Sequence, residues 1–110
     1  MNKTVKKSEF ENEVLNRSGL AVVKFSAEWS GACQIFEPIY EELSNSYDGV
    51  IRFFTVDAEE DRLLTTEYGV RELPTILFFH NGKIVDYSAG MISRNSFIAK
   101  LENAINQNKN

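Results

Sequence analysis

Three short apolar runs constrain the fold more than any other feature of this sequence. They are LAVVKFSA (20–27), VIRFFTVD (50–57) and TILFF (75–79). Each is rich in β-branched or aromatic residues and is nearly continuous, which is typical of a strand covered on both faces. Because such a sheet needs helices on each side, the runs predict an α/β protein with a central sheet between two helical layers.

Segments with helical periodicity separate these runs. Four helices are predicted, over 8–17, 32–47, 61–68 and 93–105. Ser8 and Glu11 have the spacing of a capping box, and Asp61 and Ser93 are favoured N-cap residues. Pro38 lies inside the second helix, where it removes one hydrogen bond and is expected to introduce a kink.

The last two strands are predicted to form a hairpin. Asn81-Gly82 separates 75–80 from 83–89, and this dipeptide is the strongest short signal for a two-residue turn. The sheet is therefore expected to be mixed. The 110 residues fit a single domain, 1–110, in which 106–110 form a polar tail.

Composition excludes several classes of function. The net charge of −4 argues against a nucleic-acid partner, and no apolar run approaches the roughly 20 residues that span a membrane. No apolar stretch follows the basic N-terminus, so no signal peptide is expected. One cysteine, Cys33, excludes an intramolecular disulfide and a multi-cysteine metal site. We therefore expect a cytoplasmic protein without a metal or cofactor.

Several motifs together resemble the thioredoxin family over nearly the whole chain. They are FSAEWSGACQIFEP, VDAEED, YGVRELPT, FFHNGK and the late Gly90. The resemblance implies a thioredoxin-like fold, thiol–disulfide exchange and a cis-proline at Pro74. It also implies a substrate groove formed by Trp29, Gly31, Ala32, Leu73, Pro74, Thr75, Gly90 and Met91.

The chain departs from the family pattern where the chemistry takes place. The family motif is cysteine, glycine, proline, cysteine, whereas this chain has Ser30-Gly31-Ala32-Cys33. Ser30 stands where the family has its attacking cysteine. Lys24 stands where the family has a buried aspartate, and Phe53 where it often has a lysine.

Ser30 cannot carry out the first step of disulfide exchange, because that step needs a thiolate. Its hydroxyl can instead cap the helix by accepting from the amide of Cys33. A serine nucleophile would need a base within about 3 Å. The only histidine, His80, is expected roughly 20 Å away at the far end of its strand. The sequence therefore favours a structural role for Ser30.

Cys33 and Lys24 each leave two interpretations open. Cys33 is either an inert buried side chain or a thiolate favoured by the start of a helix. Lys24 either stabilises that thiolate by its charge, or pairs with a glutamate such as Glu28 or Glu37, or extends to solvent.

Two functions are consistent with this pattern. In the first, Cys33 alone performs thiol–disulfide exchange on protein or peptide substrates, and an outside thiol from glutathione or a thioredoxin reductase releases the mixed disulfide. In the second, the groove binds extended polypeptide without redox chemistry, as a chaperone-like or scaffold module. A monomer is expected in both.

Overall fold

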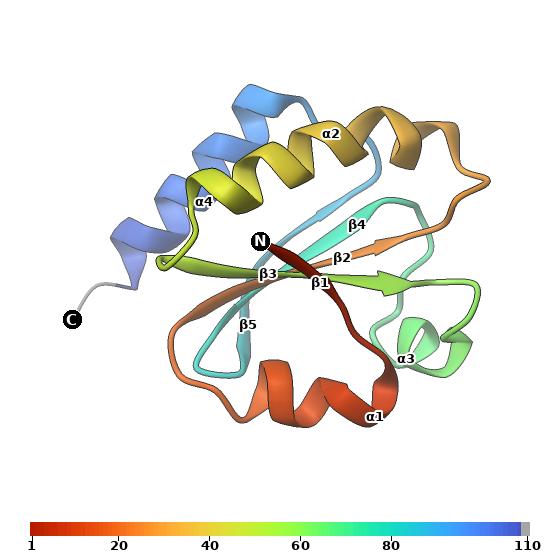
Figure 1. Cartoon of the computed structure of the whole chain (residues 1–110), viewed down its shortest axis with the longest axis horizontal. Coiled ribbons are helices and arrows are strands. Elements are labelled where there is room, and N and C mark those ends of the chain that lie inside the picture. The colour runs from red at the N-terminus through yellow and green to blue at the C-terminus, as the bar shows by residue number, and fades with distance from the viewer. Residues whose placement is uncertain (109–110) are drawn as a thin grey trace.

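A five-stranded mixed sheet forms the centre of the molecule in the computed structural model, which describes residues 1–108 (Figure 1). In chain order the elements are β1 Asn2–Thr4, α1 Lys7–Phe10, the π-helix η1 Glu11–Leu15, β2 Leu20–Ser26, α2 Gly31–Ser46, β3 Ile51–Asp57, α3 Arg62–Glu67, β4 Thr75–His80, β5 Lys83–Ala89 and α4 Arg94–Gln107. The strand order is β1-β3-β2-β4-β5. β1, β3 and β2 are parallel, and β4 and β5 are antiparallel to their neighbours. The predicted α/β architecture with a mixed sheet is confirmed.

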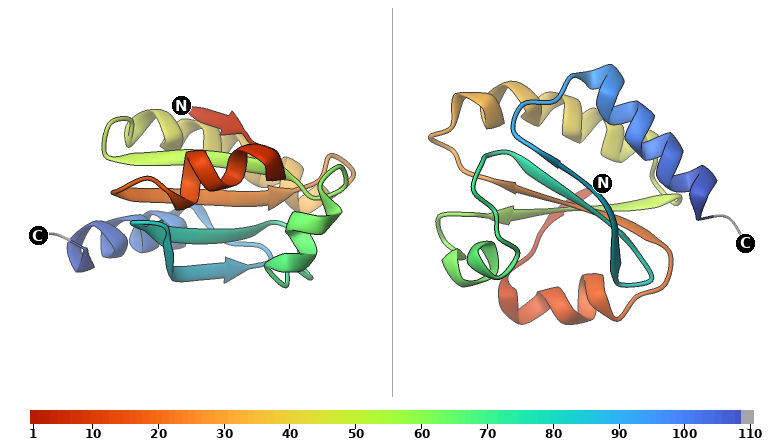
Figure 2. Two further views of the ribbon diagram at one scale, coloured as in Figure 1. Left: turned by 90° about the horizontal axis from the view of Figure 1, so that it is seen from below. Right: turned by 180° about the vertical axis from the view of Figure 1, so that it is seen from behind.

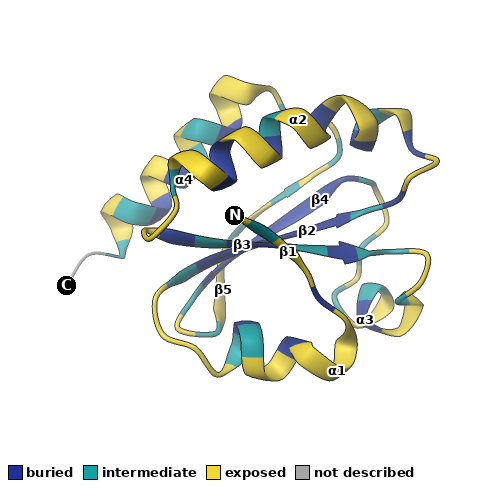
Figure 3. Cartoon of the chain, in the orientation of Figure 1, coloured by how far each residue is buried: buried dark blue, intermediate teal, exposed yellow. Residues whose placement is uncertain are grey.

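Helices cover both faces of the sheet, as the apolar runs predict. α2 and α4 lie on one face, and α1, η1 and α3 lie on the other (Figures 1 and 2). The inner strands β2, β3 and β4 are largely buried, whereas the edge strands β1 and β5 and the outer faces of the helices are mostly exposed (Figure 3). Within residues 1–108, every helix is too short or too polar to cross a membrane.

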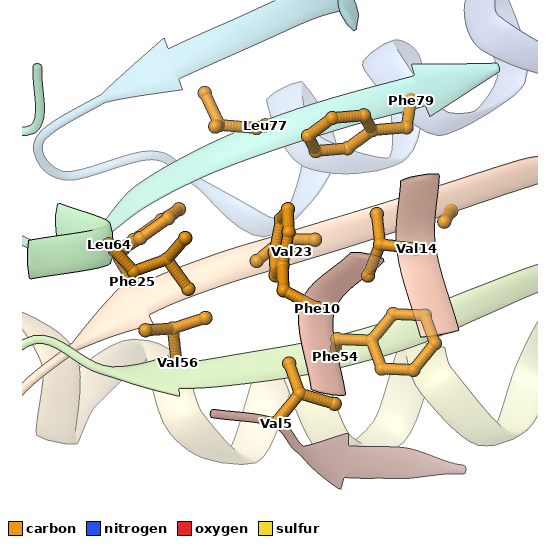
Figure 4. Close-up of a cluster of buried hydrophobic side chains, with 11 residues drawn as sticks. Val5, Phe10, Val14, Val23, Phe25, Phe54, Val56, Leu64, Leu77 and Phe79 are labelled. Carbon is orange, nitrogen blue, oxygen red and sulfur yellow. The ribbon is translucent and has the colours of Figure 1, made fainter. Parts of the chain in front are cut away.

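Alternation along β2 divides the core into two clusters. Val23 faces Phe10 and Val14 of α1 and η1, and Phe25 lies beside Leu64 of α3 in the same cluster (Figure 4). Val22 belongs to the other cluster, beneath α2 and α4. β2 therefore contributes to both layers, as expected of a central strand with no solvent-exposed face.

Aromatic side chains dominate the cluster beneath α2 and α4. The ring of Tyr40 lies 5.2 Å from that of Phe53 and 5.9 Å from that of Phe97, centroid to centroid. Its hydroxyl donates to the carbonyl of Phe54 at 2.6 Å and lies 3.3 Å from the carbonyl of Val22. Burial raises the pKa of Tyr40 well above its usual value. The hydroxyl therefore stays protonated and fixes α2 to two adjacent strands.

The N-terminal helix differs from the prediction. It begins at Lys7, so Ser8 lies inside it, and the carboxylate of Glu9 accepts from the backbone N–H of Lys6 at 3.0 Å. The predicted capping box of Ser8 and Glu11 is therefore wrong. After Phe10 the chain continues as η1, where the amide of Asn16 donates to the carbonyl of Glu11 at 2.8 Å. Apolar spacing alone does not distinguish this wider turn from an α-helix.

The other helices are close to their predicted ranges. Asp61 caps α3 by accepting from the amide of Leu64 at 3.3 Å, and Ser93 caps α4 by accepting from Ser96 at 3.1 Å. Pro38 lies inside the continuous helix α2. α4 extends through Gln107, so the first two residues of the expected polar tail are helical, and 109–110 lie outside the described residues.

The predicted hairpin turn is present at Asn81-Gly82. Both residues have positive φ, 52° and 79°, as a type I′ turn requires. The turn packs against the end of η1. A Cβ atom on Gly82 would lie 2.0 Å from the carbonyl oxygen of Leu15, so this position requires glycine for space as well as for conformation.

We expect Gly82→Ala to destabilise the protein by about 2–3 kcal/mol, because it combines a strained φ with a backbone clash. Gly49→Ala is the matched control, since Gly49 has φ 83° but no atom within 4 Å of the added Cβ. It should cost only about 1 kcal/mol. Urea unfolding measures both values, and equal losses would contradict the close approach of Leu15 to the turn.

Candidate functional site

The site lies where β2 ends and α2 begins. Ser30 is the N-cap of α2, and its hydroxyl oxygen accepts from the amide of Cys33 at 3.3 Å, as the sequence predicts. Gly31 and Ala32 follow as exposed and partly buried residues of the first turn. Cys33 is 4% exposed and Ser30 is 8% exposed. The backbone at this point is that of an ordinary capped helix, with a hydroxyl as the cap and a thiol beneath it.

Ser30 has no histidine within reach. β4 runs antiparallel to β2, so Thr75 pairs with Phe25 near the site, whereas His80 pairs with Leu20 at the opposite end. The five residue steps from Thr75 to His80 correspond to about 17 Å along a strand. Within residues 1–108 there is also no cluster of three metal-ligating side chains. Serine-histidine chemistry is therefore excluded by geometry.

Lys24 is fully buried and forms an ion pair with Glu37 of α2. The ammonium also lies 4.7 Å from the centroid of the Tyr40 ring, where the face of the aromatic system favours a cation. The carboxylate is half-exposed. The sequence leaves several partners possible for Lys24, and in the structure the partner is Glu37. The pair offsets the large cost of placing an ammonium inside the sheet.

Phe53 of β3 lies in the core on the same side of the sheet as α2. It pairs in register with Val22 of β2 and is buried against Tyr40 and Phe97. β3 therefore contributes an aromatic side chain to the core at this position. In this chain the cation is on β2 and its carboxylate is on α2.

Glu37 also connects the ion pair to the thiol. It follows Cys33 by four residues on α2, and side chains with this spacing lie on the same face of a helix. Both residues line a cleft of about 580 Å³ whose walls include Ser26, Glu28 and Asp57. We call this the acidic cleft.

A second depression adjoins the helix start and shares Ala27 with the acidic cleft. Its volume is about 460 Å³, and its lining includes Trp29, Ser30, Leu73, Arg62 and Arg71. We call this the serine groove. Two of the expected groove residues, Trp29 and Leu73, therefore lie together, with Ser30 in the same wall.

Of the remaining expected groove residues, Gly31 and Ala32 lie in the first turn of α2, whereas Pro74, Thr75, Gly90 and Met91 lie at the start of β4 or just after β5. The Leu73–Pro74 peptide bond is cis, and the amide of Gly90 donates to the carbonyl of Pro74 at 2.9 Å. Thr75 begins β4, with its hydroxyl donating to the carbonyl of Glu72 at 2.6 Å. Met91 is 59% exposed and Trp29 is 68% exposed, so both offer apolar surface to solvent.

For some residues that line the two hollows, nothing in the sequence indicated that they lie near the helix start. Arg62 and Arg71 come from α3 and the segment after it, and Asp57 ends β3. Their proximity to Ser30 or Cys33 depends on the tertiary fold. Only Glu37 has a local signal, because it follows Cys33 by one helical turn.

We expect Glu37→Gln to increase the rate at which iodoacetamide alkylates Cys33 at pH 7. The substitution leaves the buried charge of Lys24 without its carboxylate, and a nearby uncompensated cation favours a thiolate. Glu28→Gln is the matched control, because Glu28 lines the same cleft without pairing to Lys24. Mass spectrometry measures both rates, and an equal effect of the two substitutions would contradict a specific influence of Lys24 on the thiol.

Comparison with known proteins agrees with this architecture. A model of the Thioredoxin family matches residues 1–103. Thioredoxin 2 of Chlorobaculum tepidum is 34% identical over 96 residues, which cover 87% of this chain and 88% of the relative. Thioredoxin of Rickettsia felis is 33% identical over 105 residues, which cover 96% of this chain and 100% of the relative. The chloroplastic thioredoxin M-type of Pisum sativum is 33% identical over 101 residues, which cover 92% of this chain and 59% of that protein. Since both the fold and the sequence match over most of its length, the chain belongs to the thioredoxin family, whose general function is thiol–disulfide redox chemistry.

Proposed function

We propose that this protein performs thiol–disulfide exchange through the single thiol of Cys33. The observation that carries the proposal is the position of Cys33, which is in the first turn of α2 and in the wall of an open cleft. The amide dipoles at the start of a helix favour a thiolate. Ser30 keeps the backbone of the helix start by capping it, but it supplies no nucleophile for exchange.

A single thiol implies a defined reaction sequence. The Cys33 thiolate attacks one sulfur of a disulfide, a mixed disulfide forms, and the other sulfur leaves as a thiolate that takes a proton from water. No second cysteine of the chain can release the mixed disulfide, because the sequence contains one. Turnover therefore needs an outside thiol, for which we propose glutathione or a thioredoxin reductase.

The remaining parts of the proposal follow from the family. We propose protein or peptide disulfides as substrates, a cytoplasmic location where small thiols keep Cys33 reduced, and a monomer acting as one domain over 1–110. No cofactor is needed for exchange between thiols and disulfides.

The serine groove favours a second candidate function, the binding of extended polypeptide without redox chemistry. Ser30, which supplies no thiol, lines this groove together with the exposed Trp29. Backbone groups next to a strand end can pair with an added extended chain. In this alternative Cys33 is a packing residue.

We expect the folded protein to gain one glutathionyl group when it is incubated with oxidised glutathione, and to lose it when reduced glutathione is added. Mass spectrometry measures both steps, with Cys33→Ser as the control that cannot form the adduct. Ser30→Cys should add insulin reduction driven by dithiothreitol, because it restores a pair of thiols at the helix start.

Failure to form an adduct in the folded state would overturn the exchange function, provided that the urea-unfolded chain does form it. Binding of an unfolded polypeptide that persists in Cys33→Ser would then support the second candidate.

A further inference from the structure

We propose that Cys33 meets its reaction partner through the acidic cleft, and that this cleft selects a small disulfide carrying positive charge. The inference rests on the proposed exchange function and adds small cationic disulfides to the protein and peptide disulfides proposed there. It places this reaction in the acidic cleft and not in the serine groove.

Cys33 and Ser30, both at the helix start, line different hollows. Cys33 lines the acidic cleft and is not in the wall of the serine groove, whereas Ser30 lines the groove and is not in the wall of the cleft. Within residues 1–108 the thiol of Cys33, in a residue that is only 4% exposed, has no hydrogen-bond partner. The sulfur is therefore free to react, and it borders the acidic cleft, which Glu37 also lines.

The size of the acidic cleft fits a small molecule. Its volume of about 580 Å³ is within the range of small-molecule sites. β1 and β3 contribute Thr4 and Thr55 to its lining, and α2 contributes Gln34 beside Cys33. A compact ligand in this hollow would lie next to Cys33.

The charges of the cleft fit a cation. Three carboxylates line it, and Lys24 compensates only that of Glu37. Asp57 is held in place by the amides of Glu59 and Glu60, which donate to its carboxylate at 2.9 and 3.1 Å. Glu28 is exposed at the rim. The serine groove instead has Arg62 and Arg71 in its wall with a single carboxylate, that of Glu59, so the two hollows differ in net charge.

The reaction in the cleft is a balanced exchange. The Cys33 thiolate attacks one sulfur of an aminoalkyl disulfide, so the S–S bond of the reagent breaks and a bond between Cys33 and half of the reagent forms. The other half leaves as an aminothiolate and takes a proton from water. The carboxylates of Glu28 and Asp57 attract the ammonium group during approach and hold it beside the sulfur.

Three small disulfides of similar length test the proposal. They are cystamine with two positive charges, bis(2-hydroxyethyl) disulfide with none, and 3,3′-dithiodipropionate with two negative charges. Mass spectrometry measures the rate of adduct formation with Cys33 in the folded protein. Each rate is divided by the rate for the same chain unfolded in urea, which removes the intrinsic reactivity of the reagent and the effect of net charge.

The expected order of normalised rates is cystamine, then the neutral disulfide, then the dianion. We expect about a tenfold span at low salt that contracts as salt screens the charges. Glu28→Gln should lower the rate with cystamine alone. Glu11→Gln is the matched control, because it changes the net charge equally from η1 on the opposite face of the sheet (Figure 1).

Each outcome separates the inference from the proposed function. Equal normalised rates, a faster dianion, or equal effects of Glu28→Gln and Glu11→Gln would overturn the cleft as the selective route and leave exchange through Cys33 intact. A folded protein that reacts with none of the three, while the unfolded chain reacts with all, would overturn both.

Discussion

The buried ion pair of Lys24 and Glu37 is the interaction on which the arrangement of the site depends. Lys24 lies on the central strand of the sheet and is fully buried, and an unpaired ammonium there would cost several kcal/mol. Its partner comes from the first half of α2, so the helix that carries Cys33 is tied to the strand that precedes it. Tyr40 strengthens the same junction, with its ring beside the ammonium and its hydroxyl bonded to the backbone of β3.

This pair also shows how a cation is accommodated inside the thioredoxin fold. Lys24 places the cation on β2, and the carboxylate of Glu37 lies one helical turn after Cys33. Phe53 contributes an apolar ring to the core beside Tyr40. Ser30 caps the helix start, where its hydroxyl oxygen accepts from the amide of Cys33. The helix start therefore has an ordinary backbone, a hydroxyl as its cap and a single thiol.

Much of the fold follows from local features of the sequence. Continuous apolar runs predicted the buried strands, Asn81-Gly82 predicted the turn, and Asp61 and Ser93 predicted two helix starts. In the N-terminal segment, local features did not predict the type of helix. Phe10 and Val14 mark a buried stripe, but their spacing is compatible both with an α-helix and with the π-helix that forms. At the site, the cap at Ser30 is a local contact and was predictable. The partner of Lys24 remained open among several carboxylates, and the walls of the two hollows depend on strands and helices distant in the sequence.

The most direct test of the central role of the ion pair is a double-mutant cycle on Lys24 and Glu37, measured by urea unfolding. Glu37→Gln should lower the free energy of unfolding by about 3 kcal/mol, because it leaves a buried cation unpaired. Lys24→Met should cost less, because it removes the buried charge and the half-exposed carboxylate of Glu37 can turn to water. The double variant should then recover most of the loss caused by Glu37→Gln, with a coupling energy of about 2 kcal/mol. Losses that simply add would contradict the account, since they would show that the two charges do not stabilise each other.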